Sequence, residues 1–271
     1  MSILDKIIEQ KRLEIAALLN GYQLEHDAKL SPAPRDFLSA IKRGRFGLRP
    51  SLIAELKRAS PSKGILAPHL DLFQVADIYT QNGASAISVL TDEKFFLGKP
   101  ETLRELRFTR KSELPLLRKD FIIEHVQLYE TRVIGADAVL LIVAALPYNK
   151  HLFDLHALAL ELGLTPLVEV HNEAEIERAL IIPNIKLIGI NNRNLVTFDV
   201  SLETTERLRP LIPAEIAVVA ESGIFNAGDV ERLSNANVDA ILVGEALVTS
   251  DDIPAKVREL SGINVIARSE R

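Results

Sequence analysis

A repeated unit decides the fold, and its first copy is Gly83-Ala84-Ser85-Ala86-Ile87-Ser88-Val89. Similar copies follow at Gly135-Ala136-Asp137-Ala138-Val139-Leu140-Leu141 and at Asn237-Val238-Asp239-Ala240-Ile241-Leu242-Val243. Each copy begins with Gly or Asn, the residues that most readily take the left-handed conformation at the end of a helix. A short turn and an apolar run follow, so we interpret the repetition as one helix-to-strand unit used several times.

Apolar runs of this kind alternate with helical stretches from Ser51 onward. The eight runs centre on Leu52–Leu56, Ala86–Leu90, Pro115–Leu117, Ala138–Val143, Pro166–Val170, Leu187–Ile190, Ile216–Val219 and Ala240–Val243. Apolar strands that alternate with helices are typical of a parallel sheet covered on its outer face. Eight units in about 200 residues predict an α/β fold, the closed (β/α)8 TIM barrel. An open doubly wound sheet is the alternative, disfavoured because no Gly-x-Gly-x-x-Gly follows the first run.

Helical spacing of apolar residues fills the segments between the runs. We expect helices at Leu72–Gln81, Val126–Ile134, Leu152–Leu162, Glu173–Leu180, Thr204–Leu211 and Ala227–Ser234. Before the first run, residues 2–20 and Pro34–Arg43 also show helical patterning, with Pro34 in the first turn of the second helix. Residues 1–48 are therefore predicted to form a helical extension packed on the barrel. The barrel itself is expected to span residues 49–271, within a single domain.

Composition narrows the classes of function. The 271 residues carry a net charge of −5 and a sequence pI of about 5.8, which argues against a protein that binds nucleic acid through bulk charge. Cysteine is absent, which excludes disulfides and thiol chemistry. The first residues run directly into charged helical sequence, and no apolar run approaches the ~20 residues that span a bilayer. We expect a cytoplasmic protein, a monomer or weak homodimer, without a nucleic-acid or membrane partner.

The first run places charges where a TIM barrel keeps its active site. Side chains alternate along a strand, so Ile53, Glu55 and Lys57 share one face and are expected to point into the barrel mouth. Burying charges is costly unless they are paired or used. Taken alone, this Glu and Lys are equally consistent with a structural ion pair at the rim.

Several other runs end in charged or amide side chains. These are Lys119, Glu169, Asn191, Arg193 and Glu221, after the third, fifth, sixth and seventh runs. The carboxyl ends of parallel strands meet at one rim, so these side chains are expected to converge. A purely structural network of buried charges often gains little over apolar packing. We therefore predict a pocket of acids and bases that performs catalysis.

The turns after the last two runs predict an anion site. Ser222-Gly223 follows the seventh run and Gly244-Glu245 the eighth, and the backbone at a glycine can approach an anion closely. A short helix is expected to begin near Glu245, and TIM barrels commonly bind phosphate at these two turns. Lys57 or Arg193 could supply the countercharge. The expected partner is a small phosphorylated molecule.

Together these segments resemble the indole-3-glycerol phosphate synthase family. The resemblance runs through Ile53–Gly64, Leu90–Gly98, Arg118–Ile123, Leu167–His171, Gly189–Leu195, Ala220–Ile224 and Val243–Leu247, and covers essentially the whole chain. The first segment is highly specific, whereas the Glu-Ser-Gly and Val-Gly turns recur in other phosphate-binding barrels. The resemblance implies ring closure, decarboxylation and dehydration of 1-(2-carboxyphenylamino)-1-deoxyribulose 5-phosphate in tryptophan biosynthesis. It implies no metal and no organic cofactor.

The resemblance also implies catalytic roles. Lys119 would protonate the keto oxygen when the anilino ring attacks. Glu169 and Glu55 are the candidates for the acid and the base of the dehydration, and which does which stays open. Lys57 would hold the substrate carboxylate or phosphate and tune Glu55, and Asn191 would orient a hydroxyl.

A further set of residues is implied to bind the substrate. These are Ser60, Phe96, Phe121, Arg193, Glu221, Ser222, Gly223, Leu242, Gly244 and Glu245. Arg193 and the backbone of the two glycine turns would take the phosphate. Phe96 and Phe121, joined by Leu140 and Leu195, would form an apolar slot for the aromatic ring.

Two other functions remain open. A phosphoribosylanthranilate isomerase would use the same phosphate turns, but it is not expected to carry Glu55, Lys57 and Ser60-Pro61-Ser62 together or the N-terminal extension. A non-catalytic phosphate-binding barrel would have no reason to keep costly buried charges. The long loop after the first run is expected to close over the substrate and exclude water.

Overall fold

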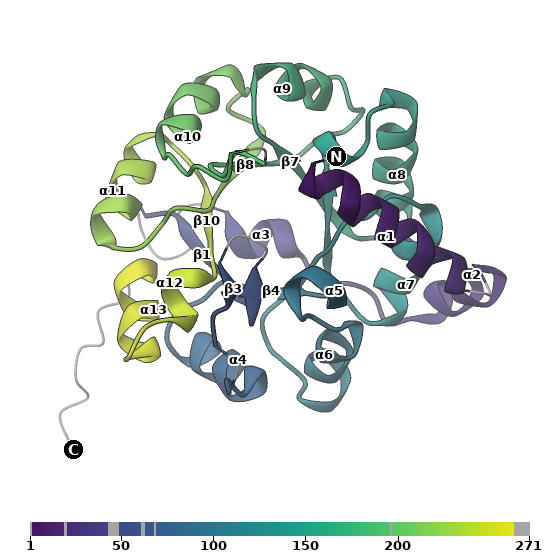
Figure 1. Cartoon of the computed structure of the whole chain (residues 1–271), viewed down its shortest axis with the longest axis horizontal. Coiled ribbons are helices and arrows are strands. Elements are labelled where there is room, and N and C mark those ends of the chain that lie inside the picture. Colours follow the sequence, from purple (N-terminus) through teal and green to yellow (C-terminus); the bar gives the residue numbers. More distant parts are fainter. Residues whose placement is uncertain are drawn as a thin grey trace.

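Eight parallel strands close into a barrel (Figure 1). The computed structural model describes residues 2–18, 21–42, 49–60, 63–67, 69–195 and 197–262. In order around the barrel the strands are β1 (Ser51–Leu56), β10 (Ala240–Val243), β9 (Ala217–Glu221), β8 (Leu187–Asn191), β7 (Thr165–Val170), β6 (Ala138–Ile142), β5 (Leu116–Lys119) and β4 (Ala86–Leu90). Pairing of β1 with both β10 and β4 completes the ring. The predicted TIM barrel is confirmed, and the open sheet is excluded.

Helices that follow the barrel strands in sequence surround the barrel, and, among the described residues, three further helices precede the first strand. The α-helices are α1 (Ile3–Ala17), α2 (Gly21–Leu30), α3 (Phe37–Ile41), α4 (Leu72–Gln81), α5 (Glu93–Phe96), α6 (Pro100–Arg104), α7 (His125–Val133), α8 (Asn149–Glu161), α9 (Glu173–Leu180), α10 (Glu203–Leu208), α11 (Ala227–Asn235), α12 (Glu245–Val248) and α13 (Ile253–Ser261). A π-helical turn (Glu105–Thr109), two 3₁₀ turns (Val143–Ala145 and Arg209–Leu211) and a small hairpin of β2 (Ala59–Ser60) and β3 (Gly64–Ile65) complete the structure.

The repeated unit is a left-handed turn that feeds a strand. Gly83, Gly135 and Asn237 have φ values of 107°, 86° and 59°, and each precedes a barrel strand. In the second and third copies, the carboxylates of Asp137 and Asp239 accept hydrogen bonds from an N–H of the preceding strand, at 2.8 and 2.9 Å. The repetition therefore reflects one way of joining a helix to a strand of this barrel.

Alternation along β1 separates two apolar cores. Leu52, Ala54 and Leu56 point outward into the layer between strands and helices. Ile53 points inward and packs with residues of the other strands inside the barrel. Glu55 follows on the inner side and reaches the cavity described below, which confirms the predicted alternation.

Helix α3 closes the end of the barrel opposite the active site. Phe37 and Ile41 are fully buried and pack with Ala86, Ala138 and Ala240, which begin three of the strands. These small alanines leave space that the two larger side chains fill, as close packing requires. Side chains of the described residues therefore fill the barrel interior at this end.

The N-terminal helices differ from the prediction in two ways. Helix α3 begins at Phe37 and not near Pro34, because the side chain of Asp36 caps it by accepting the Ser39 N–H at 2.9 Å. The expected end of this helix at Arg43 lies outside the described residues. Helix α2 was not predicted, because its sequence lacks a clear apolar stripe; it packs against α7.

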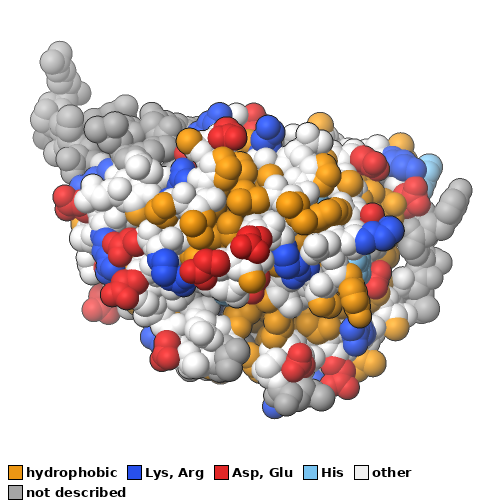
Figure 2. Space-filling model, turned by 90° about the horizontal axis from the view of Figure 1, so that it is seen from above, with side chains coloured by type: hydrophobic (Ala, Val, Ile, Leu, Met, Phe, Trp, Pro, Cys, Tyr) orange, Lys and Arg blue, Asp and Glu red, His pale blue; other side chains and the backbone are white. Residues whose placement is uncertain are grey.

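The surface carries charges of both signs. Figure 2 shows acidic and basic side chains interspersed over one face, with apolar side chains exposed between them. The described part of this face lacks the single-sign patch typical of nucleic-acid binding. No helix in the described ranges is both long and apolar enough to cross a bilayer.

Candidate active site

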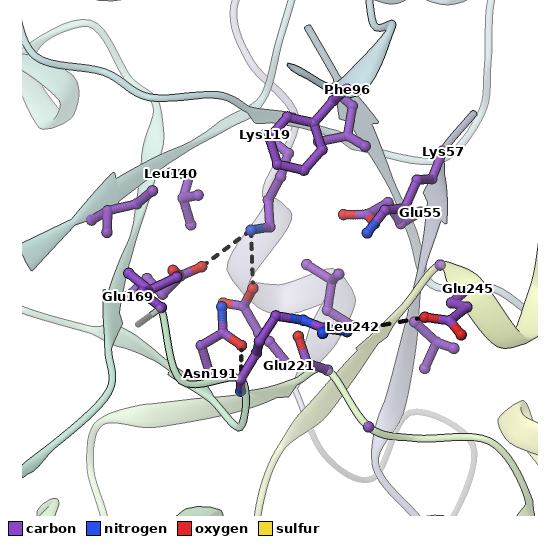
Figure 3. A pocket seen from close by; sticks show the side chains of 18 of the residues that line it. Glu55, Lys57, Phe96, Lys119, Leu140, Glu169, Asn191, Glu221, Leu242 and Glu245 are labelled. Atoms are coloured by element: carbon purple, nitrogen blue, oxygen red, sulfur yellow. Dashed lines mark hydrogen bonds and ion pairs between the residues drawn. The ribbon is translucent and has the colours of Figure 1, made fainter. Parts of the chain in front are cut away.

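A pocket opens at the carboxyl ends of the barrel strands, where polar residues from several strands converge (Figure 3). It is lined by every predicted catalytic residue: Glu55, Lys57, Lys119, Glu169 and Asn191. It is also lined by Phe96, Phe121, Leu140, Arg193, Leu195, Glu221, Ser222, Gly223, Leu242, Gly244 and Glu245. Ser60 lies in β2, and its side chain is outside the described part of the structure. The sequence thus predicted which residues meet, while their roles remain predictions.

Lys119 occupies the centre of the pocket. Its Nζ lies 3.1 Å from Glu169 Oε2 and 3.3 Å from Glu221 Oε2, so one cation from β5 contacts carboxyl groups from β7 and β9 (Figure 3). Burial alone would lower the pKa of Lys119, but the charges of Glu169, Glu221 and Glu55 outweigh it and raise that pKa. Lys119 is therefore a protonated ammonium at neutral pH.

The two carboxyl groups beside Lys119 differ in their affinity for a proton. Burial raises the pKa of Glu221 to about 8, and repulsion from Glu169 adds to this against the attraction of Lys119. Burial would also raise the pKa of Glu169, but Lys119, His171 and the amide of Asn191 hold it well below its usual range. Of these two groups, Glu169 thus favours its ionised form and Glu221 its protonated form, an arrangement suited to acid–base chemistry.

Two glycines make room for the carboxyl groups. A Cβ at Gly189 of β8 would overlap Oε1 of Glu221, and a Cβ at Gly244 would lie 2.5 Å from Oε1 of Glu55. Neither position can therefore hold a side chain while the carboxyl group keeps its place. Gly244 was predicted for its closeness to phosphate, and the structure adds this second reason for a glycine there.

The apolar side of the pocket is formed by aromatic rings. The ring centroids of Phe96 and Phe121 are 6.1 Å apart and the planes are tilted by 37°. Lys57 Nζ lies 5.9 Å from the centroid of Phe96 and 3.5 Å from Glu55 Oε1, so this cation links the aromatic wall to a carboxylate. This side of the pocket could hold a planar aromatic ring with an anionic substituent.

Arg193 and the two predicted turns form a further part of the lining. The guanidinium of Arg193 is 4.0 Å from Glu245 Oε2, and its backbone N–H donates to Asn191 Oδ1 at 3.0 Å. Ser222 and Gly223 are both left-handed, with φ values of 68° and 79°. Helix α12 begins at Glu245 as predicted, so the turn after β10 ends at a helix start.

Helix α1 contributes a wall that was not predicted. It crosses one side of the barrel mouth, and Ile3, Leu4 and Ile7 line the pocket (Figure 1). Their helical spacing shows an apolar face in the sequence, but periodicity does not say which end of a barrel a helix covers. The pocket also includes Leu90, Asp120, Ile142, Phe198, Ile224, Phe225, Val243 and Ala246, which were not predicted.

His171 was not predicted either, and it lies beside the pocket without lining it. It directly follows β7, two positions after Glu169, and so lies on the same face of the strand's extension. Its Nε2 is 3.3 Å from Glu169 Oε1. The Glu-Val-His spacing was the available signal, because alternate residues of a strand share a face. Among the described residues, no group of three or more His, Cys, Asp or Glu could hold a metal ion, and the expected lack of a cofactor stays a prediction.

Comparison of folds finds solved structures that resemble this chain in shape alone. The 3-hexulose-6-phosphate synthase of Salmonella typhimurium superposes with a TM-score of 0.60 at 12% identity, covering 78% of this chain and 97% of its own. The thiamine phosphate pyrophosphorylase of Pyrococcus furiosus gives 0.55 at 19% identity, covering 78% and 94%. At these identities the likeness supports the fold and nothing finer.

Comparison of sequences is far more specific. The family model described as indole-3-glycerol phosphate synthase matches residues 4–260. A protein of that name from Desulforamulus reducens is 50% identical over 264 residues, covering 95% of this chain and 96% of its own. Another from Polaromonas naphthalenivorans is 47% identical over 263 residues, covering 96% and 98%. The chain therefore belongs to the indole-3-glycerol phosphate synthase family.

Proposed function

We propose that the pocket converts 1-(2-carboxyphenylamino)-1-deoxyribulose 5-phosphate into indole-3-glycerol phosphate, CO2 and water, as a carboxy-lyase of tryptophan biosynthesis. One observation carries the proposal: Lys119 Nζ is held 3.1 Å from Glu169 and 3.3 Å from Glu221 in a pocket with an aromatic wall. The reaction needs a proton donor and a proton acceptor beside a place for an aromatic ring. The site offers all three.

Ring closure is assigned to Lys119. Its ammonium donates a proton to the keto oxygen while the ring carbon that bears the carboxylate attacks the keto carbon. A carbon–carbon bond forms and the carbonyl becomes a hydroxyl. Loss of CO2 then returns the bonding electrons to the ring and restores its aromaticity. A positioned acid contributes about 10²–10⁴-fold to such a step.

Dehydration is assigned to groups on both sides of Lys119. The hydroxyl leaves as water with a proton from the Glu55–Lys57 pair, whose Oε1 and Nζ are 3.5 Å apart. Glu169 accepts the proton lost from the adjacent carbon, because its depressed pKa keeps it a carboxylate. This choice assigns the base role that the sequence left open between Glu55 and Glu169.

Binding is assigned to the two ends of the pocket. Arg193 and the backbone N–H groups of the turns at 222–223 and 244–245 take the phosphate. Phe96 and Phe121 hold the aromatic ring, and Lys57 lies where it can meet the ring carboxylate. Four further residues complete the proposed site, by orienting hydroxyls or by contacting the sugar and anilino nitrogen: Asn191, Glu221, Ser222 and Leu242. Ser60 stays a prediction.

An activity measurement tests this function directly. Formation of indole-3-glycerol phosphate is followed by absorbance for the wild-type protein, for Lys119→Ala and for Lys150→Ala, an exposed surface control. We expect turnover by wild type and control, and near-total loss in Lys119→Ala with an unchanged circular dichroism spectrum. Turnover that survives Lys119→Ala would move the acid elsewhere. Lack of wild-type turnover would reject the function, and an isomerase assay would then separate an isomerase from a non-catalytic barrel.

The assembly and the cellular setting complete the proposal. Side chains of a single chain build the described pocket, which fits activity as a monomer or weak homodimer. A small phosphorylated substrate and a role in amino-acid biosynthesis fit a cytoplasmic location. Sedimentation velocity at several protein concentrations tests the first, and fractionation of the source cells tests the second.

A further inference from the structure

Glu169 lies between a lysine and a histidine. Its Oε2 lies 3.1 Å from Lys119 Nζ, and its Oε1 lies 3.3 Å from Nε2 of His171. His171 is not among the described residues that line the pocket, and its side chain is 9% exposed. The Lys119 contact is a hydrogen bond, whereas Nε2 of His171 lies at ion-pair distance and makes no hydrogen bond. Each oxygen of Glu169 therefore faces its own nitrogen, and a charge on His171 would attract the carboxylate through space.

A second carboxylate holds the other face of the imidazole. Nδ1 of His171 lies 3.0 Å from Glu175 Oε2, which also accepts the backbone N–H of His171 at 2.8 Å. Oε1 of Glu175 accepts from Asn172 Nδ2 at 2.9 Å, and the Glu175 N–H donates to Asn172 Oδ1 at 3.0 Å. Glu175 is thus anchored in the first turn of α9, where Asn172 is the N-cap residue.

Both ring nitrogens of His171 therefore face carboxylate oxygens. A neutral imidazole has one donor and one acceptor nitrogen, so it would set a lone pair against one of these oxygens. Only the doubly protonated ring suits both neighbours. Burial opposes this charge, but Glu169 and Glu175 outweigh burial and raise the pKa of His171 to about 10.

We propose that His171, held as an imidazolium by Glu175, is a positioning residue that keeps Glu169 ionised and aims its Oε2 at Lys119. Within the described residues, the charged groups that contact the imidazole are Glu169 of β7 and Glu175 of α9. Lys119 and Glu221 act on the imidazole through Glu169. This inference rests on the proposed function, in which Glu169 is the base. It adds a chain of contacts that runs from Glu175 in the first turn of α9 through His171 and Glu169 to Lys119.

Nuclear magnetic resonance of ¹⁵N-histidine tests the charge without any assay of activity. We expect both nitrogens of His171 to be protonated at pH 7.5 and to titrate only at distinctly alkaline pH. His156 is the matched internal control: it is also buried, but burial alone lowers its pKa to about 4, so its ring should be neutral. A neutral His171 ring at pH 7.5 would overturn the proposal, whether or not the protein is a synthase.

Two variants then separate positioning from simple packing. The variant His171→Gln keeps a hydrogen-bond donor but loses the charge. We expect its single-turnover rate to be about 10–100-fold lower, and its KM in steady-state measurements to stay within about threefold. In its profile of rate against pH, the acid limb should lie at a pH higher by about one unit or more than in wild type, because Glu169 loses a nearby cation and its pKa rises. Glu175→Gln should move the alkaline limb downward, because His171 then releases its proton at lower pH.

The control and the contrary outcome complete the test. His156→Gln removes a buried histidine of α8 that is not among the described residues lining the pocket, and both limbs of the pH–rate profile should stay in place. A purely structural His171 would give slower variants whose limbs coincide with those of wild type, and that result would refute positioning. If His171→Gln does not fold, Glu175→Gln and the resonance titration still decide.

Discussion

Lys11 of α1 places its Nζ 2.9 Å from Oδ1 of Asp120, the residue that directly follows Lys119. The same Nζ lies 2.9 Å from Oδ2 of Asp92, after β4. All three side chains are at most 4% exposed. The helix that walls the pocket is thus tied by a buried ion pair to the strand end that carries the central lysine.

Removal of this lysine should destabilise the protein strongly. Lys11→Met leaves Asp92 and Asp120 buried without their shared cation, and breaking a buried pair costs about 3–5 kcal/mol. Urea unfolding measures the change. The control is Lys29→Met, which removes an exposed pair with Glu25 that should contribute only about 0–1 kcal/mol. Equal effects of the two substitutions would contradict a buried anchor.

The two carboxyl groups beside Lys119 should respond differently to the same substitution. Gln imitates a protonated carboxyl group, so Glu221→Gln should retain far more activity at pH 7 than Glu169→Gln, which loses the proposed base and about 10²–10⁴-fold in kcat. Steady-state kinetics from pH 6 to 9 provide the comparison. Similar losses in both variants would mean that the proton does not reside on Glu221.

The same proton makes stability depend on pH. The pKa of Glu221 is raised from 4.5 to about 8 in the folded state, so between these values the folded protein binds a proton that the unfolded chain has released. The contribution of Glu221 to the free energy of unfolding is therefore fully present below pH 4.5 and is lost as the pH rises through about 8. Glu221→Gln cannot ionise, so its Tm should exceed that of wild type at pH 8.5, with a smaller gap at pH 4.5. Calorimetry checks this, and exposed Glu215→Gln should give a curve parallel to wild type.

Gly244 should not tolerate a methyl group. In Gly244→Ala the new Cβ would lie 2.5 Å from Glu55 Oε1, so Glu55 must move or the turn must shift. Overpacking of this kind costs about 1–3 kcal/mol, and we expect kcat to fall as well. Gly228→Ala is the control, because its Cβ would approach only the Asn226 side chain, at 3.0 Å, away from the pocket. An unchanged kcat in Gly244→Ala would show that turnover does not depend on the position of the Glu55 carboxyl group.

The loop after β1 should affect binding more than folding. Lys63 forms an ion pair with Glu245 beside the proposed phosphate turn, and both groups are at least partly exposed. Lys63→Ala should raise KM a few-fold and change Tm little, because exposed pairs contribute about 0–1 kcal/mol. Deletion of residues 62–64, of which Ser62 lies outside the described residues, should reduce turnover further. Unchanged kinetics in both variants would reject closure of this loop over the substrate.

The barrel and its rim could be predicted because strands follow a strict rule. Side chains alternate, so Ile53, Glu55 and Lys57 had to share a face, and parallel strands bring their carboxyl ends to one rim. Lys119, Glu169 and the other rim residues then had to meet. Their positions at the ends of successive strands are therefore enough to predict that these side chains line one pocket.

Other features depend on contacts that periodicity does not encode. The apolar face of α1 is visible in the sequence, but its place over the pocket is set by Lys11 and its two distant carboxylates. The protonation difference between Glu169 and Glu221 depends on burial and on His171, a residue outside the lining. Helix α2 gains its stability from packing on α7 and not from a strong pattern of its own.

The seal made by Phe37 and Ile41 has a kinetic consequence. Among the described residues, side chains fill the barrel behind the active site and leave no path along its axis. We therefore expect substrate to arrive, and product to depart, through the pocket that α1 lines at the carboxyl ends of the strands. The two molecules therefore exclude each other, so the product should inhibit competitively, and slow departure of the product would delay every following turnover.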